Sequence, residues 1–201
     1  DALIERIIKH CQERGIKPCV VISPNCAPDD LPQRLLAHGF TQYGDPEYWL
    51  TLKNFLPAEM LRGPGNVTVR KIGRDELGDF CKVMAGAYEM PEEATPILER
   101  SFGYIHDLPG IHNFVAYIEG KPVGCISMFS YQGYGALGSG GVLPGARHLG
   151  AAFALTAAGY QAWKKDGNKV MVFQTMLPKL ERALRIGGCE RVFTCHYYTL
   201  E

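Results

Sequence analysis

The sequence lacks the features that would assign it to several common classes of protein. Its 21 Lys and Arg residues are balanced by 21 Asp and Glu residues, so no overall field favours DNA, RNA or an anionic membrane as a partner. No apolar run approaches the length of a membrane span, and no signal peptide is visible. The chain begins at Asp1 without a Met, so any targeting segment upstream lies outside this sequence. We therefore expect neither nucleic acid nor membrane as a partner.

Cysteine is present, but it does not occur with metal-binding spacing. There are 7 cysteines, which is an odd number, and no C-x-x-C occurs. Scattered cysteines in apolar surroundings are typical of reduced, buried thiols in a cytoplasmic protein, which is the location we predict. The 6 histidines are scattered as well. We therefore predict no metal site.

No acidic side chain occurs between Tyr134 and Gln161. An apolar, glycine-rich run predicts a strand at 133–143, and the small residues at 151–165 predict a helix. The turn between them would expose the N-terminus of that helix, whose unpaired N–H groups and partial positive charge attract phosphate.

Two other phosphate-binding motifs, the dinucleotide fingerprint and the P-loop, do not fit this sequence. The G-x-G-x-x-G at 133–138 leads into no helix and has no acidic residue about 20 positions later, and no glycine run ends in Lys-Ser or Lys-Thr.

The turn resembles the acyl-CoA-binding loop of the GNAT superfamily of N-acetyltransferases, V-x-P-x-x-R-x-x-G-x-G/A. Every fixed position of that motif is filled, by Val142, Pro144, Arg147, Gly150 and Ala152. The resemblance implies acetyl-CoA as the cofactor. The cofactor-binding residues that it implies are Val142, Leu143, Arg147, His148, Leu149, Gly150, Ala151 and Ala152.

Periodicity along the rest of the chain predicts a mixed α/β fold. Helices are expected at 3–14, 31–38, 74–88, 92–106, 151–165 and 177–186. Strands are expected at 18–23, 48–52, 67–72, 113–118, 123–131, 133–143, 170–174, 192–193 and 197–200. From Val67 onward this order is also that of the GNAT fold, which implies a mostly antiparallel central sheet flanked by helices.

An internal repeat suggests a tandem organisation. The segment after Gly15 resembles the segment after Gly167, and the helix before Gly39 resembles the helix before Gly188. We therefore predict a partial, C-terminal half of a GNAT-like unit at 1–55, a linker at 56–66 and a GNAT domain at 67–201. The open alternative is that any α/β protein yields such helix–strand–helix stretches.

The catalytic residues are harder to identify than the cofactor loop. The family commonly uses a Tyr four residues before the Gly of a "GF" pair on its last helix as the general acid. Here Leu184 stands four before Gly188, and Cys189 replaces the Phe. Our candidates for proton transfer are Ser139 and Tyr131. An enzyme lacking the usual acid would turn over slowly, and faster at alkaline pH.

The resemblance implies transfer of an acetyl group to a primary amine. It locates the acceptor site near 88–93, 102–104 and the last strand. We interpret these stretches as aromatic and nearly uncharged, which favours a small-molecule amine over a polycation. Two alternatives stay open: a non-catalytic acyl-CoA-binding or sensing module, and a structural pseudo-domain that forms a homodimer.

Overall fold

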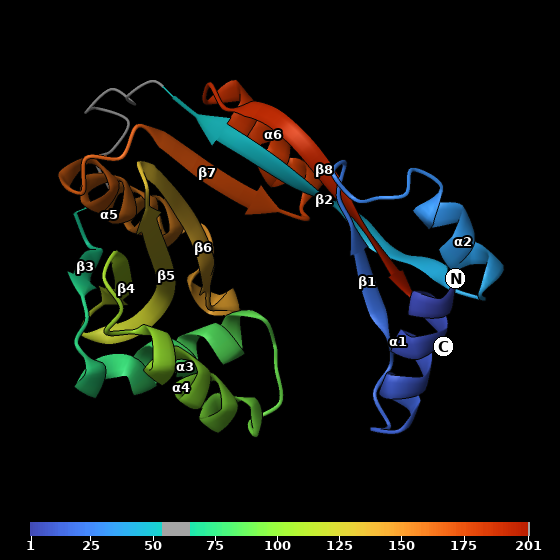
Figure 1. Cartoon of the computed structure of the whole chain (residues 1–201). Helices are drawn as coiled ribbons and strands as arrows, with labels where there is room; N and C mark the ends of the chain where they lie inside the picture. The colour runs from blue at the N-terminus through green and yellow to red at the C-terminus, as the bar shows by residue number, and fades with distance from the viewer. Residues whose placement is uncertain (54–64, 201) are drawn as a thin grey trace. The chain divides into compact units, whose positions relative to one another are not determined.

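The computed structural model describes residues 1–53 and 65–200. Helices and strands are interspersed along the chain (Figure 1). In chain order they are α1 (Ala2–Gln12), β1 (Cys19–Ile22), α2 (Leu31–Ala37), β2 (Thr41–Leu52), β3 (Thr68–Lys71), the 3-10 turn η2 (Arg74–Glu76), α3 (Leu77–Ala87), α4 (Ala94–Ile105), β4 (Ile111–Ile118), β5 (Lys121–Tyr131), β6 (Tyr134–Val142), the 3-10 turn η3 (Pro144–Ala146), α5 (Ala151–Lys165), β7 (Val170–Thr175), α6 (Pro178–Ile186) and β8 (Glu190–Thr199). The predicted class, a mixed and mostly antiparallel sheet with flanking helices, is confirmed.

Two strands differ from the prediction. β2 begins at Thr41 rather than at residue 48, because a register shift between Tyr43 and Glu47 accommodates the Gly-Asp-Pro triplet that reads as a turn. β8 is one strand where two short ones were predicted, because the residues between them are also paired: Thr194 and Cys195 pair with β2, and His196 pairs with β1. The predicted linker at 56–66 lies outside the described residues, except for Gly65 and Asn66.

The chain divides into two compact units. The first unit comprises residues 1–51 and 174–201, and the second comprises residues 52–173. The last strand joins the N-terminal residues because β8 lies between β1 and β2 and pairs antiparallel with both. The predicted ranges 1–55 and 67–201 therefore do not coincide with the compact units. They stay a prediction about repeated sequence.

The second unit is built on strands in the order β7–β6–β5–β4–β3. All neighbours are antiparallel except β6 and β7, which are parallel. Helices cover both faces, because adjacent residues of a strand point to opposite sides. Cys125 packs in a core with α3 and α4, whereas a Cβ at Gly124 would touch Leu155 of α5. That core contains Ile72, Leu77, Phe80, Cys81, Val83, Met84, Phe102, Val115, Tyr117 and Cys125.

Glycines let α5 approach the sheet closely. A Cβ on Gly135 of β6 would overlap the ring of Trp163, and a Cβ on Gly159 of α5 would overlap the side chain of Leu137. Trp163 is 1% exposed and donates its indole N–H to the carbonyl of Val170 at 3.0 Å. Each large apolar side chain buried in this way contributes about 1.5–3 kcal/mol. Gly135 of β6 and Gly159 of α5 thus allow the helix to lie close to the sheet. This close packing also determines the position of the helix N-terminus.

The first unit has its own core. α1 and α2 contribute Ile4 and Leu35, the turn after α2 contributes Phe40, and β8 contributes Tyr198. Glu47 of β2 is a buried carboxylate here, and it accepts hydrogen bonds from the indole of Trp49 at 2.8 Å and from the side chain of Gln174. These partners satisfy both of its oxygens, as a buried carboxylate requires.

Candidate functional site

The end of β6 is irregular where it approaches the turn. Ile126 of β5 faces two residues of β6, Ser139 and Gly140, so the strand bulges there. Ser139 has a φ of 46°, which is uncommon for a residue other than glycine. Pairing of β6 with β7 covers only the four pairs that end at Leu137 and Phe173. The bulge and the missing pairing together give β6 an irregular edge just before the turn.

The β6–α5 loop, residues 143–150, presents the N-terminus of α5. Gly150 is the N-cap residue, with a φ of 85°. The first helical hydrogen bond runs from the Ala154 N–H to the Gly150 carbonyl at 3.0 Å. Among the described residues, no acceptor is recorded for the N–H groups of Gly150, Ala151, Ala152 and Phe153. The first turn of α5 contains no acidic side chain, so these donors and the helix dipole favour an anion.

Arg147 holds the loop against α3. Its Nε donates to the carbonyl of Val142 at 3.3 Å, and its Nη2 donates to the carbonyl of Ala87 at 3.0 Å. Ala87 is the last residue of α3. The carbonyl groups in the last turn of a helix have no N–H partner within the helix, so this one is free to accept from Arg147. A guanidinium carries five N–H donors, so the side chain can hold the loop and still face an anion.

The remaining loop residues point in different directions. Leu143 packs against the α3 core, and a Cβ on Gly86 would lie 2.7 Å from its Cδ2. Ala151 is fully buried under the helix, so only its backbone can meet a ligand. The exposed residues are His148, Leu149 and Ala152, and Val142 is half-buried. His148 has a φ of 70°, so two left-handed residues bracket Leu149 in the turn.

The two predicted catalytic residues lie apart. Ser139 is exposed at the bulge, three residues before Val142. Tyr131 pairs with Tyr134 at the β5–β6 turn, at the other end of β6. With a rise of about 3.3 Å per residue, β6 separates Tyr131 from the β6–α5 loop by about 25 Å. The structure therefore brings Ser139, but not Tyr131, toward the loop.

Tyr88 is a neighbour of the bulge that sequence reasoning did not single out. It follows α3, and its hydroxyl donates to the carbonyl of Gly140 at 2.9 Å. Burial raises the pKa of Tyr88, and the nearby Cys125 adds to the shift. The family resemblance places 88–93 in the acceptor region, but nothing in the sequence indicates this hydrogen bond. Residues 88 and 140 are far apart in the chain and come together only in the folded structure.

The thiols near this site are not suited to nucleophilic chemistry. Burial raises the pKa of Cys81 to about 11 and that of Cys125 to about 12. Both are therefore protonated near neutral pH, and only the thiolate is a strong nucleophile. The expectation of buried thiols holds for four of the seven cysteines, whereas Cys11 and Cys26 are half-buried and Cys19 is exposed.

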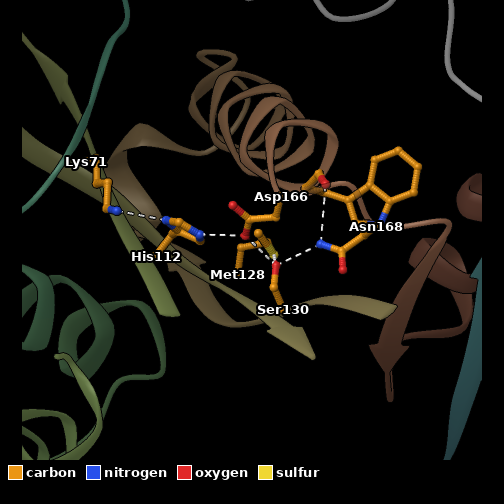
Figure 2. Close-up of polar contacts among 7 residues, drawn as sticks. Lys71, His112, Met128, Ser130, Asp166 and Asn168 are labelled. Carbon is orange, nitrogen blue, oxygen red and sulfur yellow. Dashed lines mark hydrogen bonds and ion pairs between the residues drawn. The ribbon is translucent and has the colours of Figure 1, made fainter. Parts of the chain in front are cut away.

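A polar cluster at the C-terminal end of α5 contains an aspartate, a histidine and a serine, which are the residue types of a catalytic triad, but they are not connected as a triad is (Figure 2). Asp166 accepts hydrogen bonds from Ser130 at 2.6 Å and from Nε2 of His112 at 2.7 Å, and Lys71 donates to Nδ1 of that histidine at 2.8 Å. Asn168 donates to Ser130 at 2.7 Å. No hydrogen bond joins the histidine to the serine, and the carboxylate that accepts the serine's hydrogen bond is a weak base, because its hydrogen bonds outweigh burial and lower the pKa of Asp166. We assign the cluster to anchoring α5 on β3, β4 and β5.

Within residues 1–53 and 65–200, no group of three or more His, Cys, Asp and Glu side chains is placed so that it could hold a metal ion. None of the helices in those residues is long and apolar enough to cross a membrane.

The sequence matches the model of one protein family. Residues 79–186 match the acetyltransferase (GNAT) family, so the match covers β4, β5, β6, the loop and α5. A comparison with curated proteins finds no match.

Several solved structures share the fold. A GCN5-related N-acetyltransferase from Kribbella flavida is 19% identical with a TM-score of 0.71, over 98% of this chain and 73% of that one. One from Sphaerobacter thermophilus is also 19% identical, with a TM-score of 0.73 over 98% of this chain and 66% of that one. A tandem GNAT protein from the clavulanic acid biosynthesis pathway is 16% identical, with a TM-score of 0.68 over 100% of this chain and 69% of that one. At these identities the likeness shows the fold alone.

Proposed function

Since the chain belongs to the acetyltransferase (GNAT) family, we propose that it transfers the acetyl group of acetyl-CoA to the primary amine of a small molecule. One observation supports this above the others. The N-terminus of α5 offers the N–H groups of Gly150, Ala151, Ala152 and Phe153, without a recorded acceptor and without an acidic side chain in the first turn. This set of donors fits a pyrophosphate.

The residues around the loop have separate roles in this proposal. The N–H groups of Gly150, Ala151 and Ala152 would hold the pyrophosphate, and Arg147 would hold the loop on α3 and add positive charge. Bound acyl-CoA would supply a thioester for the amine to attack. Ser139 at the bulge is the proposed proton-transfer group, with Tyr88 beside it. We do not extend the proposal to Tyr131, because of its distance along β6.

The surroundings of the acceptor region favour a cationic amine. Residues 88–93 were interpreted as nearly uncharged, but Glu89, Glu92 and Glu93 are all exposed there. Phe102 cannot line the site, because it is 8% exposed and packs against Phe80 at 4.9 Å between ring centroids. Exposed carboxylates attract a protonated amine. That amine would pass its proton to solvent water, with the Ser139 hydroxyl as a relay, before the free base attacks, because a serine hydroxyl is too weak a base to keep the proton.

A charge reversal at the loop tests cofactor binding. We expect Gly150→Asp to abolish binding of acetyl-CoA in calorimetry, because it adds a carboxylate where pyrophosphate is expected. The matched control is Gly167→Asp. Gly167 follows the other end of α5, has a similar φ of 73°, and a Cβ there would meet nothing within 4 Å. If both variants bind acetyl-CoA as the parent does, the proposed cofactor site is wrong.

The second candidate function is a non-catalytic acyl-CoA-binding module. It is favoured by Leu184, which stands where the family commonly has a tyrosine and cannot donate a proton. Release of free thiol from acetyl-CoA with a panel of small amines separates the two. Cofactor binding without any amine-dependent thiol release would support the module.

We also propose that the first and last segments are copies of one half-domain. The element order α1–β1–α2–β2 matches α5–β7–α6–β8. Gly39 and Gly188 have φ values of 85° and 94°, and the helices before them end with the same hydrogen bonds. Phe40 N–H donates to the Leu35 carbonyl at 3.1 Å, and Cys189 N–H donates to the Leu184 carbonyl at 3.0 Å. In this alignment Leu184 corresponds to Leu35, a core residue.

A cytoplasmic location remains part of the proposal, supported by seven unpaired cysteines.

A further inference from the structure

A pocket lies at the C-terminal end of α6, within the first unit. Its volume is about 690 Å³. Its walls come from the last turns of α6 and from the start of β8, and the lining residues are Arg182, Arg185, Ile186, Cys189, Glu190 and Arg191. None of these residues belongs to the β6–α5 loop. A molecule bound here would therefore be a second ligand of the chain, separate from the cofactor.

Arg191 is held in one orientation by a buried carboxylate. Its Nε and Nη2 both donate to Oε1 of Glu181, at 3.0 Å and 2.6 Å, and the side chain of Glu181 is only 8% exposed. The guanidinium also lies over the ring of Tyr48, with Cζ 4.8 Å from the ring centroid. A guanidinium carries five N–H donors, so the two bonds to Glu181 leave others for a ligand. These donors are oriented before any ligand binds, which lowers the entropic cost of binding.

Two further arginines line the pocket from α6. Arg182 and Arg185 are three residues apart, and side chains at this spacing lie next to each other on a helix. No hydrogen bond or ion pair of Arg182 is recorded within residues 1–53 and 65–200. Arg185 lies 3.8 Å from Glu181, and its side chain is 57% exposed. Both side chains can therefore turn toward a ligand.

The pocket has more positive than negative charge. Its three arginines meet two carboxylates: Glu181, which Arg185 and Arg191 share, and Glu190, which already interacts within the chain. The thiol of Cys189 adds no charge, because burial raises its pKa to about 11. Arg185 in the last turn of α6 also stabilises the helix through its dipole. That effect accounts for one cation, but it does not require three guanidinium groups around one pocket.

We propose that this pocket binds a compact multivalent anion, in which several phosphate or carboxylate groups are adjacent. Guanidinium groups bind both kinds of group through two parallel N–H···O bonds. Adjacent acidic groups would let Arg182 and Arg185 bind at the same time as Arg191. Acetyl-CoA spreads its charges along an extended molecule, so we expect it not to occupy this pocket. The proposal does not depend on acetyl transfer.

Calorimetry on the full chain tests the proposal with two probes, inorganic triphosphate and citrate. The titrations are run at about 0.15 M salt, where interactions between exposed charges are largely screened. We expect the parent to bind at least one probe under these conditions. Tighter binding of triphosphate would identify phosphate as the ligand group, and tighter binding of citrate would identify carboxylate.

Two single variants locate the binding site. Arg182→Ala and Arg185→Ala should each weaken binding of the probe about 5- to 20-fold, because a charge-assisted contact is lost. Both side chains are exposed, so these variants should fold. Arg191 is left in place, because its removal would leave Glu181 buried without its closest partner. Arg6→Ala, at an exposed arginine of α1 outside the pocket, is the matched control and should bind as the parent does.

Gly150→Asp separates this pocket from the N-terminus of α5, which could attract the same probes. Binding that survives in Gly150→Asp and weakens in the two arginine variants supports the pocket. Binding that is lost in Gly150→Asp but kept in both arginine variants would place the anion at the β6–α5 loop and overturn the proposal. A parent that binds neither probe would overturn it as well, and would leave the proposed acetyl transfer unaffected.

Discussion

Three residues with positive φ lie where the function is proposed. Ser139 at the bulge and His148 and Gly150 in the loop all have φ between 46° and 85°. Such conformations are costly for residues other than glycine and persist only where surrounding contacts hold them. Here Arg147 supplies two of those contacts, to Val142 and Ala87. The shape of the loop therefore depends on the fold around it as much as on its own glycines.

Asp166 should make stability depend on pH. Burial alone would raise its pKa, but hydrogen bonds from Ser130 and His112 and the charge of Lys71 outweigh burial and hold the pKa below its ordinary value of 3.8. A carboxyl group with a lowered pKa stabilises the fold above its unfolded pKa, and this stabilisation is lost as pH falls through the folded value. We expect Asp166→Ala to lower the free energy of unfolding by about 1–3 kcal/mol near pH 7.

Urea unfolding of parent and variant over a series of pH values measures this difference. The gap between the two should begin to shrink below about pH 4, where this carboxyl group takes up a proton in the unfolded chain, and should be lost as the pH falls through the lower pKa of the folded state. Glu92→Ala, which removes an exposed carboxylate, serves as the control and should change stability little at any pH. A gap that stays constant across the series would show that Asp166 acts through packing rather than charge.

At the scale of elements, the contact of α5 with β6 depends on small residues. Gly135 lies so close to the ring of Trp163 that an added Cβ would overlap it, and Trp163 is fully buried and cannot move aside freely. We expect Gly135→Ala to lower the free energy of unfolding by about 1–3 kcal/mol, as overpacking usually does. Thermal unfolding by calorimetry checks it. Gly65→Ala, where a Cβ would meet nothing within 4 Å, should leave the melting temperature nearly unchanged.

Most elements could be predicted from the sequence because their periodicity is local. The loop was predicted from Pro144, Arg147 and Gly150, whose order is visible in the chain. The contact of Tyr88 with Gly140 could not be predicted, because it joins residues far apart in sequence and leaves no pattern in either segment. The full length of β2 was missed because its bulge is occupied by turn-forming residues, and only pairing with β8 keeps them in a strand.

The two compact units show why sequence order alone gave different domain limits. A repeat in sequence predicts consecutive domains, but β8 pairs with β1 and β2, so strand pairing groups the last residues with the first. Sequence similarity locates the copies, whereas only long-range hydrogen bonding determines which strands share a sheet. The repeat hypothesis and the compact units therefore describe different properties of the chain.

One acetyl-CoA should bind per chain, although we propose two related half-domains. The N-terminus of α5 has no acidic residue in its first turn, whereas α1 begins after Asp1 and carries Glu5 in its first turn. Negative charge at a helix start repels a pyrophosphate and occupies the helix dipole. Calorimetry of the 201-residue chain should therefore give a stoichiometry of one, and Gly150→Asp should remove all of the heat. Two equivalents in the parent, with one surviving in Gly150→Asp, would locate a second site outside the α5 loop and overturn this assignment.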